Sequence, residues 1–166
     1  MKLFCSATVL SLLLGAQAVT PTTAKANLAD ALAGGKKWKA DAILIQVVGT
    51  RIGTDGKNVS WEYGFYSASA KTCAIVYVAR GQSMAKESGE PATCQAPELK
   101  EFMDSDQAMG IARKNGITKP LASMAASVEG NRPTWNVMDG GGAASGDVIL
   151  EIDATSGSIV SKVTQK

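Results

Sequence analysis

The 166-residue sequence contains no histidine. An imidazole general base, a Ser-His or Cys-His catalytic couple and a histidine metal ligand are therefore excluded. A large excess of one charge is also lacking, because 17 basic and 15 acidic residues leave a formal net charge of +2. This balance predicts no contact with nucleic acid or anionic lipid. The hydrophobic content of 45% is typical of a chain that folds into one ordinary domain or two very small ones.

Residues 1–18 have the order of a secretory signal peptide. Lys2 precedes an apolar run from Leu3 to Ala16, and the small residues Ala16 and Ala18 form a cleavage site. The run is shorter than the roughly 20 apolar residues that span a bilayer. We therefore expect cleavage after Ala18, no stable membrane span in the mature protein, and a periplasmic or secreted location. An uncleaved anchor and a second cleavage site after Ala26 are the alternatives.

Cysteine is scarce, and its positions suit an exported protein. Cys5 lies in the signal segment without lipobox-like residues before it, so we do not predict lipidation there. The remaining cysteines, Cys73 and Cys94, are even in number in a compartment that permits disulfides, and we expect them to pair. Two buried free thiols are the alternative. Two thiolates without histidine cannot complete a zinc shell, so neither a metal site nor any other cofactor is predicted.

Composition divides the rest of the chain into a tether at 19–26, a first unit at 27–81, a linker at 82–102 and a second unit at 103–166. The tether is small, polar and contains proline. The linker contains glycine and proline without a sustained apolar period, which favours a loop.

Both units begin with a helical pattern. Leu28, Ala31 and Leu32 have helical spacing, and this helix either stops at Gly34-Gly35 or continues distorted to Trp38. The second helix has Ser105 as its predicted N-cap residue, Asp106 in its first turn and a stop at Asn115-Gly116. Strand-like runs follow each helix, at 42–52, 59–66 and 73–78 in the first unit and at 121–128, 134–138, 147–153 and 158–163 in the second.

The turns between these runs favour antiparallel neighbours. Asp55-Gly56 is a strong hairpin signal between the first two runs. The predicted fold class is α+β, with two helix-then-antiparallel-meander units and the helices packed on one face of each sheet. The expected core residues are Trp61, Tyr63, Phe65, Ile75 and Tyr77 in the first unit and Val148, Leu150, Ile152 and Ile159 in the second.

One motif lies in the C-terminal half. Trp135 begins a strand, a glycine-rich spacer follows, and the strand at 147–153 ends in Asp153-Ala-Thr-Ser-Gly157. Asp153 can accept backbone N–H groups within the following turn, and Gly157 tolerates a positive φ. Residues 103–163 thereby resemble a PepSY or PepSY-like domain, and the first unit is similar in its order of elements. The resemblance implies an exported bacterial protein that inhibits or regulates a peptidase.

Other candidate sites have simpler explanations. Ser83 and Lys86 match the Ser-x-x-Lys pattern of acyltransferases, but the partner motifs of those enzymes are missing. The acidic residues Glu98, Glu101, Asp104 and Asp106 could bind a hard cation, although a solvated helix start explains them better. The stripe of Trp61, Tyr63 and Phe65 is more typical of core than of a ligand platform.

These observations favour a protein without catalytic activity. We expect an exported PepSY-like module that binds or regulates a protein or peptide partner, acting through its second unit. A structural accessory domain of the cell envelope and a small secreted hydrolase are the alternatives. Trp135, Asp153 and Gly157 are predicted as structural motif residues, and no catalytic residue is assigned.

Overall fold

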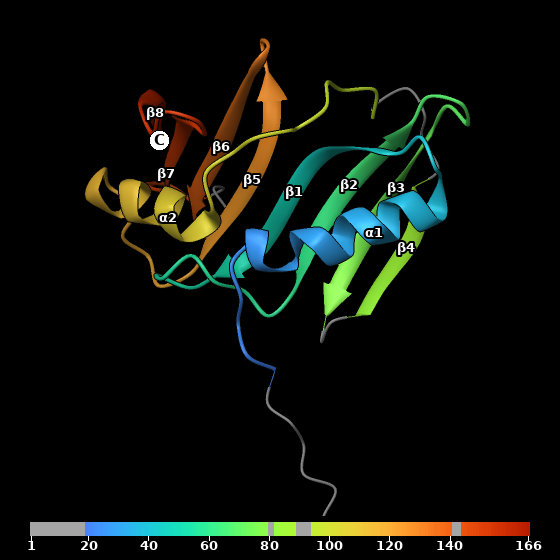
Figure 1. Ribbon diagram of the computed structural model, residues 1–166. Helices are drawn as coiled ribbons and strands as arrows, with labels where there is room; N and C mark the ends of the chain where they lie inside the picture. Colours follow the sequence, from blue (N-terminus) through green and yellow to red (C-terminus); the bar gives the residue numbers. More distant parts are fainter. Residues whose placement is uncertain (1–18, 80–81, 89–93, 141–143) are drawn as a thin grey trace, which may run out of the picture.

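The computed structural model describes residues 19–79, 82–88, 94–140 and 144–166. The predicted signal peptide lies outside these residues. The strands form one sheet of eight in the order β4-β3-β2-β1-β5-β6-β7-β8, and all neighbours are antiparallel (Figure 1). The elements are a short 3-10 helix (Lys25–Asn27), α1 (Leu28–Trp38), β1 (Ile43–Ile52), β2 (Trp61–Ser67), β3 (Thr72–Ala79), β4 (Gln82–Ser88), α2 (Ser105–Lys114), β5 (Ala122–Glu129), β6 (Arg132–Asp139), β7 (Val148–Asp153) and β8 (Ile159–Thr164). Within the described residues, no helix is both long and apolar enough to cross a membrane.

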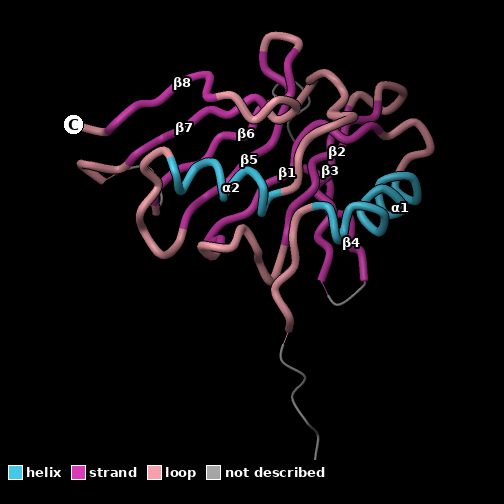
Figure 2. Tube along the Cα trace, turned by 60° about the vertical axis from the view of Figure 1, so that its left-hand side comes forward, coloured by secondary structure: helices cyan, strands magenta, loops and turns pink. Residues whose placement is uncertain are grey.

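The predicted fold class, two helix-then-meander units each with its own sheet, is wrong. Strands β1 and β5 pair with each other, from Gln46 opposite Ser127 to Ile52 opposite Ala122, and so join the meanders into one sheet. Both helices lie on the same side of this sheet (Figures 1 and 2). The alternation of apolar residues assigns the two faces of each strand, but it does not say which strand lies beside it.

One hydrophobic core extends beneath both helices. Trp61 of β2 and Trp135 of β6 are both 0% exposed, and their ring centroids are 6.4 Å apart in an edge-to-face arrangement. Phe102 also packs edge-to-face against Trp135, with ring centroids 6.0 Å apart. The aromatic rings therefore join the two halves of the sheet at its centre.

Strand β4 was not predicted, because its residues fall in the region expected to be a linker. Seven pairs connect it to β3, from Cys73 opposite Ser88 to Ala79 opposite Gln82. The sequence lacks an apolar period here because β4 is a sheet edge, and most of its side chains are exposed on either face. Its N–H and C=O groups nevertheless pair with β3, which supplies the stabilisation that the side chains do not.

Helix α1 continues through Gly34-Gly35, where one of the predicted alternatives placed its end. The glycines allow the helix to lie close to the sheet. A Cβ atom at Gly35 would lie 2.5 Å from the ring of Phe65, and one at Gly34 would lie 2.9 Å from the Ser83 hydroxyl oxygen. Their helix-breaking tendency is therefore outweighed by tertiary packing.

The core prediction is correct for most positions. Trp61, Tyr63, Phe65, Val148, Leu150 and Ile152 are buried. Ile75 and Tyr77 were wrongly assigned, because the residues of β3 buried on the helix-covered face are Ala74, Val76 and Val78, opposite Phe65, Tyr63 and Trp61 of β2. Ile159 is 37% exposed at the edge of the sheet, so its assignment to the core was also wrong.

Candidate binding surface

The sheet has one face beneath the helices and a second face that no described helix covers. We call the second one the open face. The strand pairing shows which side chains lie on the open face, because side chains at paired positions form rows across the sheet. The central row runs through Met84, Tyr77, Glu62, Val48, Ala125, Asn136, Glu151 and Ser161, from β4 at one edge to β8 at the other.

The half of the open face formed by β1–β4 is rich in apolar and aromatic groups. Tyr66, Ile75 and Tyr77 are half-buried, and Met84 is 68% exposed. Tyrosine and methionine are enriched in protein interfaces, since they offer a large contact area together with adaptable packing. Sequence reasoning missed this surface, because the alternation of β3 was assigned to the wrong face.

The half of the open face formed by β5–β8 is polar. The guanidinium of Arg132 lies 3.9 Å from the Glu151 carboxylate and 3.8 Å from that of Asp153. The Asn136 amide donates to the Glu129 carboxylate at 2.9 Å. Three acidic groups thus accompany one arginine here, so this half carries negative charge beside the apolar half.

The predicted motif residues have structural roles. Trp135 is fully buried, and its indole N–H donates to the Met103 carbonyl at 2.9 Å. Asp153 Oδ1 accepts the N–H groups of Thr155 and Ser156 at 2.9 and 2.8 Å, and these bonds lower the pKa of Asp153. Gly157 has a φ of 78°. The strand-end turn therefore has the geometry expected from the sequence.

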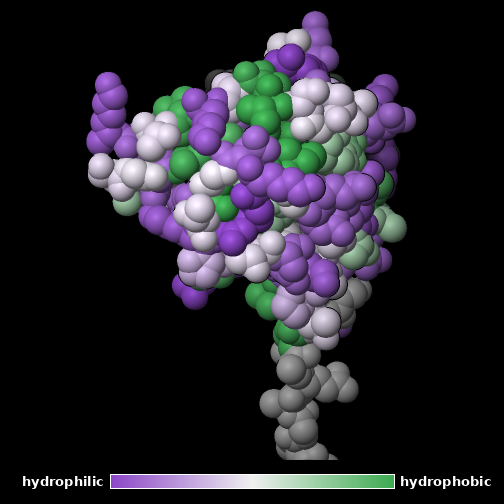
Figure 3. Space-filling model, turned by 90° about the vertical axis from the view of Figure 1, so that its left-hand side faces the viewer, coloured by the Kyte–Doolittle hydropathy of each residue, from purple (hydrophilic) through white to green (hydrophobic). Residues whose placement is uncertain are grey.

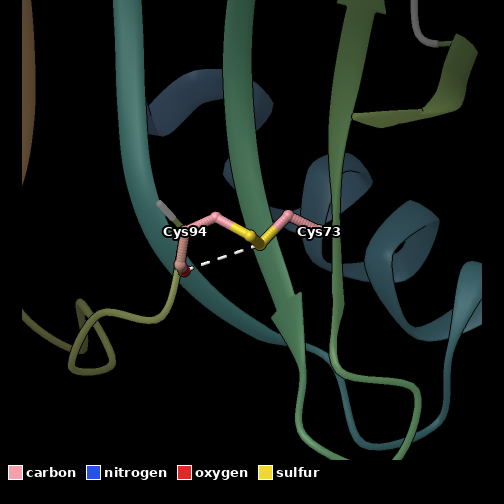
Figure 4. The surroundings of a disulfide bond; sticks show 2 residues. All are labelled: Cys73 and Cys94. Carbon is pink, nitrogen blue, oxygen red and sulfur yellow. Dashed lines mark hydrogen bonds between the residues drawn. A yellow bond between two sulfur atoms is a disulfide. The ribbon is translucent and has the colours of Figure 1, made fainter. Parts of the chain in front are cut away.

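The predicted disulfide is present. Cys73 of β3 and Cys94 are bonded, with Cα atoms 6.2 Å apart, and the bond lies across β2 (Figure 4). Beyond Cys94, the Leu99 N–H donates to the Leu44 carbonyl at 2.7 Å. The bond secures the segment that connects β4 to α2 at one end of the sheet, and closing a loop of this size stabilises a domain by roughly 3 kcal/mol.

Residues 22–25, within the predicted tether, pack between the two halves of the molecule. The Tyr63 hydroxyl donates to the Ala24 carbonyl at 2.6 Å, and the Ala24 N–H donates to the Ser105 hydroxyl at 3.0 Å. Burial, together with the negative charges of Asp104 and Asp30, raises the pKa of Tyr63. This tyrosine is therefore a neutral hydrogen-bond donor that holds the segment in place.

In the acidic cluster of residues 98–106, Asp104 and Asp106 lie at the start of α2. Asp104 is the N-cap residue of α2, one position before the predicted Ser105, and it forms a capping box with Gln107. Asp104 also accepts the Lys25 N–H at 2.9 Å. Among the described residues, no group of three or more His, Cys, Asp or Glu side chains could hold a metal ion.

The Ser83 and Lys86 pair cannot act as nucleophile and base in this structure. Ser83 lies opposite Val78, a buried residue of the helix-covered face, whereas Lys86 lies opposite Ile75 on the open face. Because residues three apart in a strand point to opposite faces, the hydroxyl and the amine are separated by the sheet.

Asp41 gives the fold a predictable response to acid. Its carboxylate accepts the Ser69 N–H and the Ser67 hydroxyl, each at 2.8 Å, and these bonds lower its pKa from 3.8 to about 2. Since the folded-state pKa is the lower one, this contribution to stability is complete above the unfolded value and is lost as the pH falls through the folded value.

We therefore expect Asp41→Asn to flatten the decrease in stability between about pH 4 and pH 2, as measured by urea unfolding at several pH values. The control is Glu101→Gln, a change at another exposed carboxyl, which should leave the slope of the unmodified protein in place. Equal slopes for the Asp41 variant and the unmodified protein would contradict the assignment.

Comparison with known proteins adds one structural relationship. No family model matches the sequence, and neither does any curated protein. The crystal structure of a "putative lipoprotein" from Clostridium difficile 630 resembles this chain with a TM-score of 0.58. The match covers 92% of this chain and 98% of that one at 12% identity. At this identity the likeness shows the fold alone.

Proposed function

We propose that this chain is an exported, non-catalytic module that binds a protein or peptide partner on the open face of its sheet. The observation that carries the proposal is the group of Tyr66, Ile75, Tyr77 and Met84 on a face that no described helix covers. Large aromatic and aliphatic side chains that are together at least partly accessible at one surface are typical of interaction sites.

Further observations support this proposal. The disulfide and the signal-like sequence of residues 1–18 suit an exported protein. The structural neighbour is named a "putative lipoprotein", which suits the cell envelope. The resemblance of residues 103–163 to PepSY domains suggests that the partner is a peptidase. The separation of Ser83 from Lys86 argues against the one nucleophile and base pair that the sequence offered.

Site-specific photo-cross-linking tests the proposal. A photoreactive amino acid at position 84 should give a covalent adduct with one protein of the exported fraction, and Tyr77→Glu in the same chain should remove that adduct. The control carries the photoreactive residue at position 32 on α1, where the native leucine is 39% exposed. Adducts of equal yield from both positions, or an adduct that Tyr77→Glu leaves unchanged, would contradict binding at the open face.

A further inference from the structure

Strand β8 forms an edge of the sheet that differs from the other edge. All six of its residues are exposed, and Ile159, Val160 and Val163 are aliphatic. Strand β4, at the opposite edge, is polar apart from Met84 and Ala85, carries both Lys86 and Glu87, and is packed against α1. Natural proteins usually protect their edges with charged residues or covering elements, and β8 has less of this protection than β4.

The outer side of β8 presents backbone groups that are ready to pair. Gln165 donates its N–H to the Asp147 carbonyl and accepts the Gly146 N–H, both at 2.9 Å, so its groups point inward. In an antiparallel ladder, inward and outward residues alternate. The N–H and C=O groups of Thr164 and Lys162 therefore point away from β7, toward the edge.

The side chains of β8 differ between the two faces of the sheet. Val163 lies on the open face, in a cross-strand row with Ile149 of β7 and Met138 of β6. Lys162 and Thr164 lie on the helix-covered side, opposite Leu150 and Val148. The next residue of this alternation is Lys166. Ile159, opposite Ile152, lies on this side as well, and Ser161, opposite Glu151, lies on the open face. The C-terminal part of β8 therefore presents Val163 with its aliphatic row on the open face and Lys162 on the helix-covered side.

The end of helix α2 adds to the positive charge. A Cβ atom at Gly116 would lie 2.9 Å from Lys162 Nζ, so the lysine is next to the segment that follows α2. Arg113 and Lys114 form the last turn of that helix. The acidic groups nearby already have partners, since Asp147 pairs with Lys119 and Glu151 accepts the Ser161 hydroxyl at 3.2 Å.

We propose that β8 binds an extended segment of a partner protein as a ninth strand, and that this segment alternates aliphatic and acidic residues. Backbone pairing with Thr164 and Lys162 would supply affinity, as in other cases of strand addition. Aliphatic side chains of the segment would meet Val163 and its row, and carboxylates would meet Lys162 and Lys166. Figure 3 faces this end of the molecule, where hydrophobic side chains lie among hydrophilic ones. This surface is separate from the apolar half of the open face.

The test uses a synthetic peptide of alternating valine and glutamate, with a valine and lysine peptide of the same length as the charge control. The glutamate peptide should bind in calorimetry and should slow hydrogen exchange at the Thr164 and Lys162 amides. Thr164→Pro removes an outward N–H without removing an inward ladder bond, so it should weaken binding by about tenfold. Thr164→Val keeps that N–H and should bind as the unmodified protein does.

Equal binding of the two peptides, or exchange protection at β4 in place of β8, would overturn the proposal. Thr164→Pro with unchanged affinity would overturn it as well, provided that circular dichroism shows a folded variant. If that variant is unfolded, Lys162→Glu decides the outcome: it should weaken binding of the glutamate peptide and strengthen binding of the lysine peptide. Tyr77→Glu should leave peptide binding at β8 intact. This variant therefore distinguishes a failure of the β8 proposal from a failure of the open-face proposal.

Discussion

Replacement of Trp135 by alanine should lower the free energy of unfolding by about 3 to 5 kcal/mol, which is the usual cost of removing a buried aromatic side chain. Trp135 is 0% exposed and contacts both Trp61 and Phe102, with ring centroids 6.4 and 6.0 Å away. The change would leave a cavity where the two halves of the sheet meet. It would also leave the Met103 carbonyl without its indole donor.

Urea unfolding followed by circular dichroism measures this effect. The matched control is Trp38→Ala, because Trp38 is half-buried on α1 and its indole N–H donates to Glu87 near the sheet edge. The control should cost clearly less than the Trp135 variant. If the two variants had equal midpoints and slopes, Trp135 would not be central to the core.

Replacement of Gly56 by alanine should destabilise the protein through two separate effects. Gly56 has a φ of 73°, and the left-handed conformation costs a non-glycine residue about 1 to 2 kcal/mol. A Cβ atom at this position would also lie 2.5 Å from the Ser105 carbonyl oxygen and from the Asp106 Cα atom. Because these are backbone atoms at the start of α2, the helix would have to move, at a further cost of about 1 to 3 kcal/mol.

Gly130→Ala separates the two effects. Gly130 has a φ of 55°, but nothing lies within 4 Å of an added Cβ atom. This control should carry the conformational cost alone, so the Gly56 variant should unfold at a lower urea concentration. The same stability for both variants would show that the contact between the β1–β2 turn and α2 is not tight.

The disulfide and the strand-end turn follow from short-range chemistry. An even number of cysteines behind an export signal favours the Cys73–Cys94 bond. Asp153 and Gly157 are close in sequence, and the carboxylate accepts the N–H groups of the residues just after it. Such a turn depends on a few neighbouring residues, and for this reason the sequence predicts it well.

The edges of the sheet depend on long-range pairing. Strand β4 lacks an apolar period, and its stabilisation comes from backbone bonds with β3. In β8, Ile159 has the residue type of the core but is 37% exposed, because β8 is an edge strand. Residue type alone does not distinguish a central strand from an edge strand.

The sequence by itself determined the positions of seven strands and both helices to within a few residues, the disulfide pair and the final turn, because each depends on local periodicity or nearby chemistry. The tertiary structure alone decided that β1 pairs with β5 and that Ile75 and Tyr77 belong to the open face. The physical reason is that strand pairing joins residues far apart in the chain, and alternation defines two faces without stating which of them the helices cover.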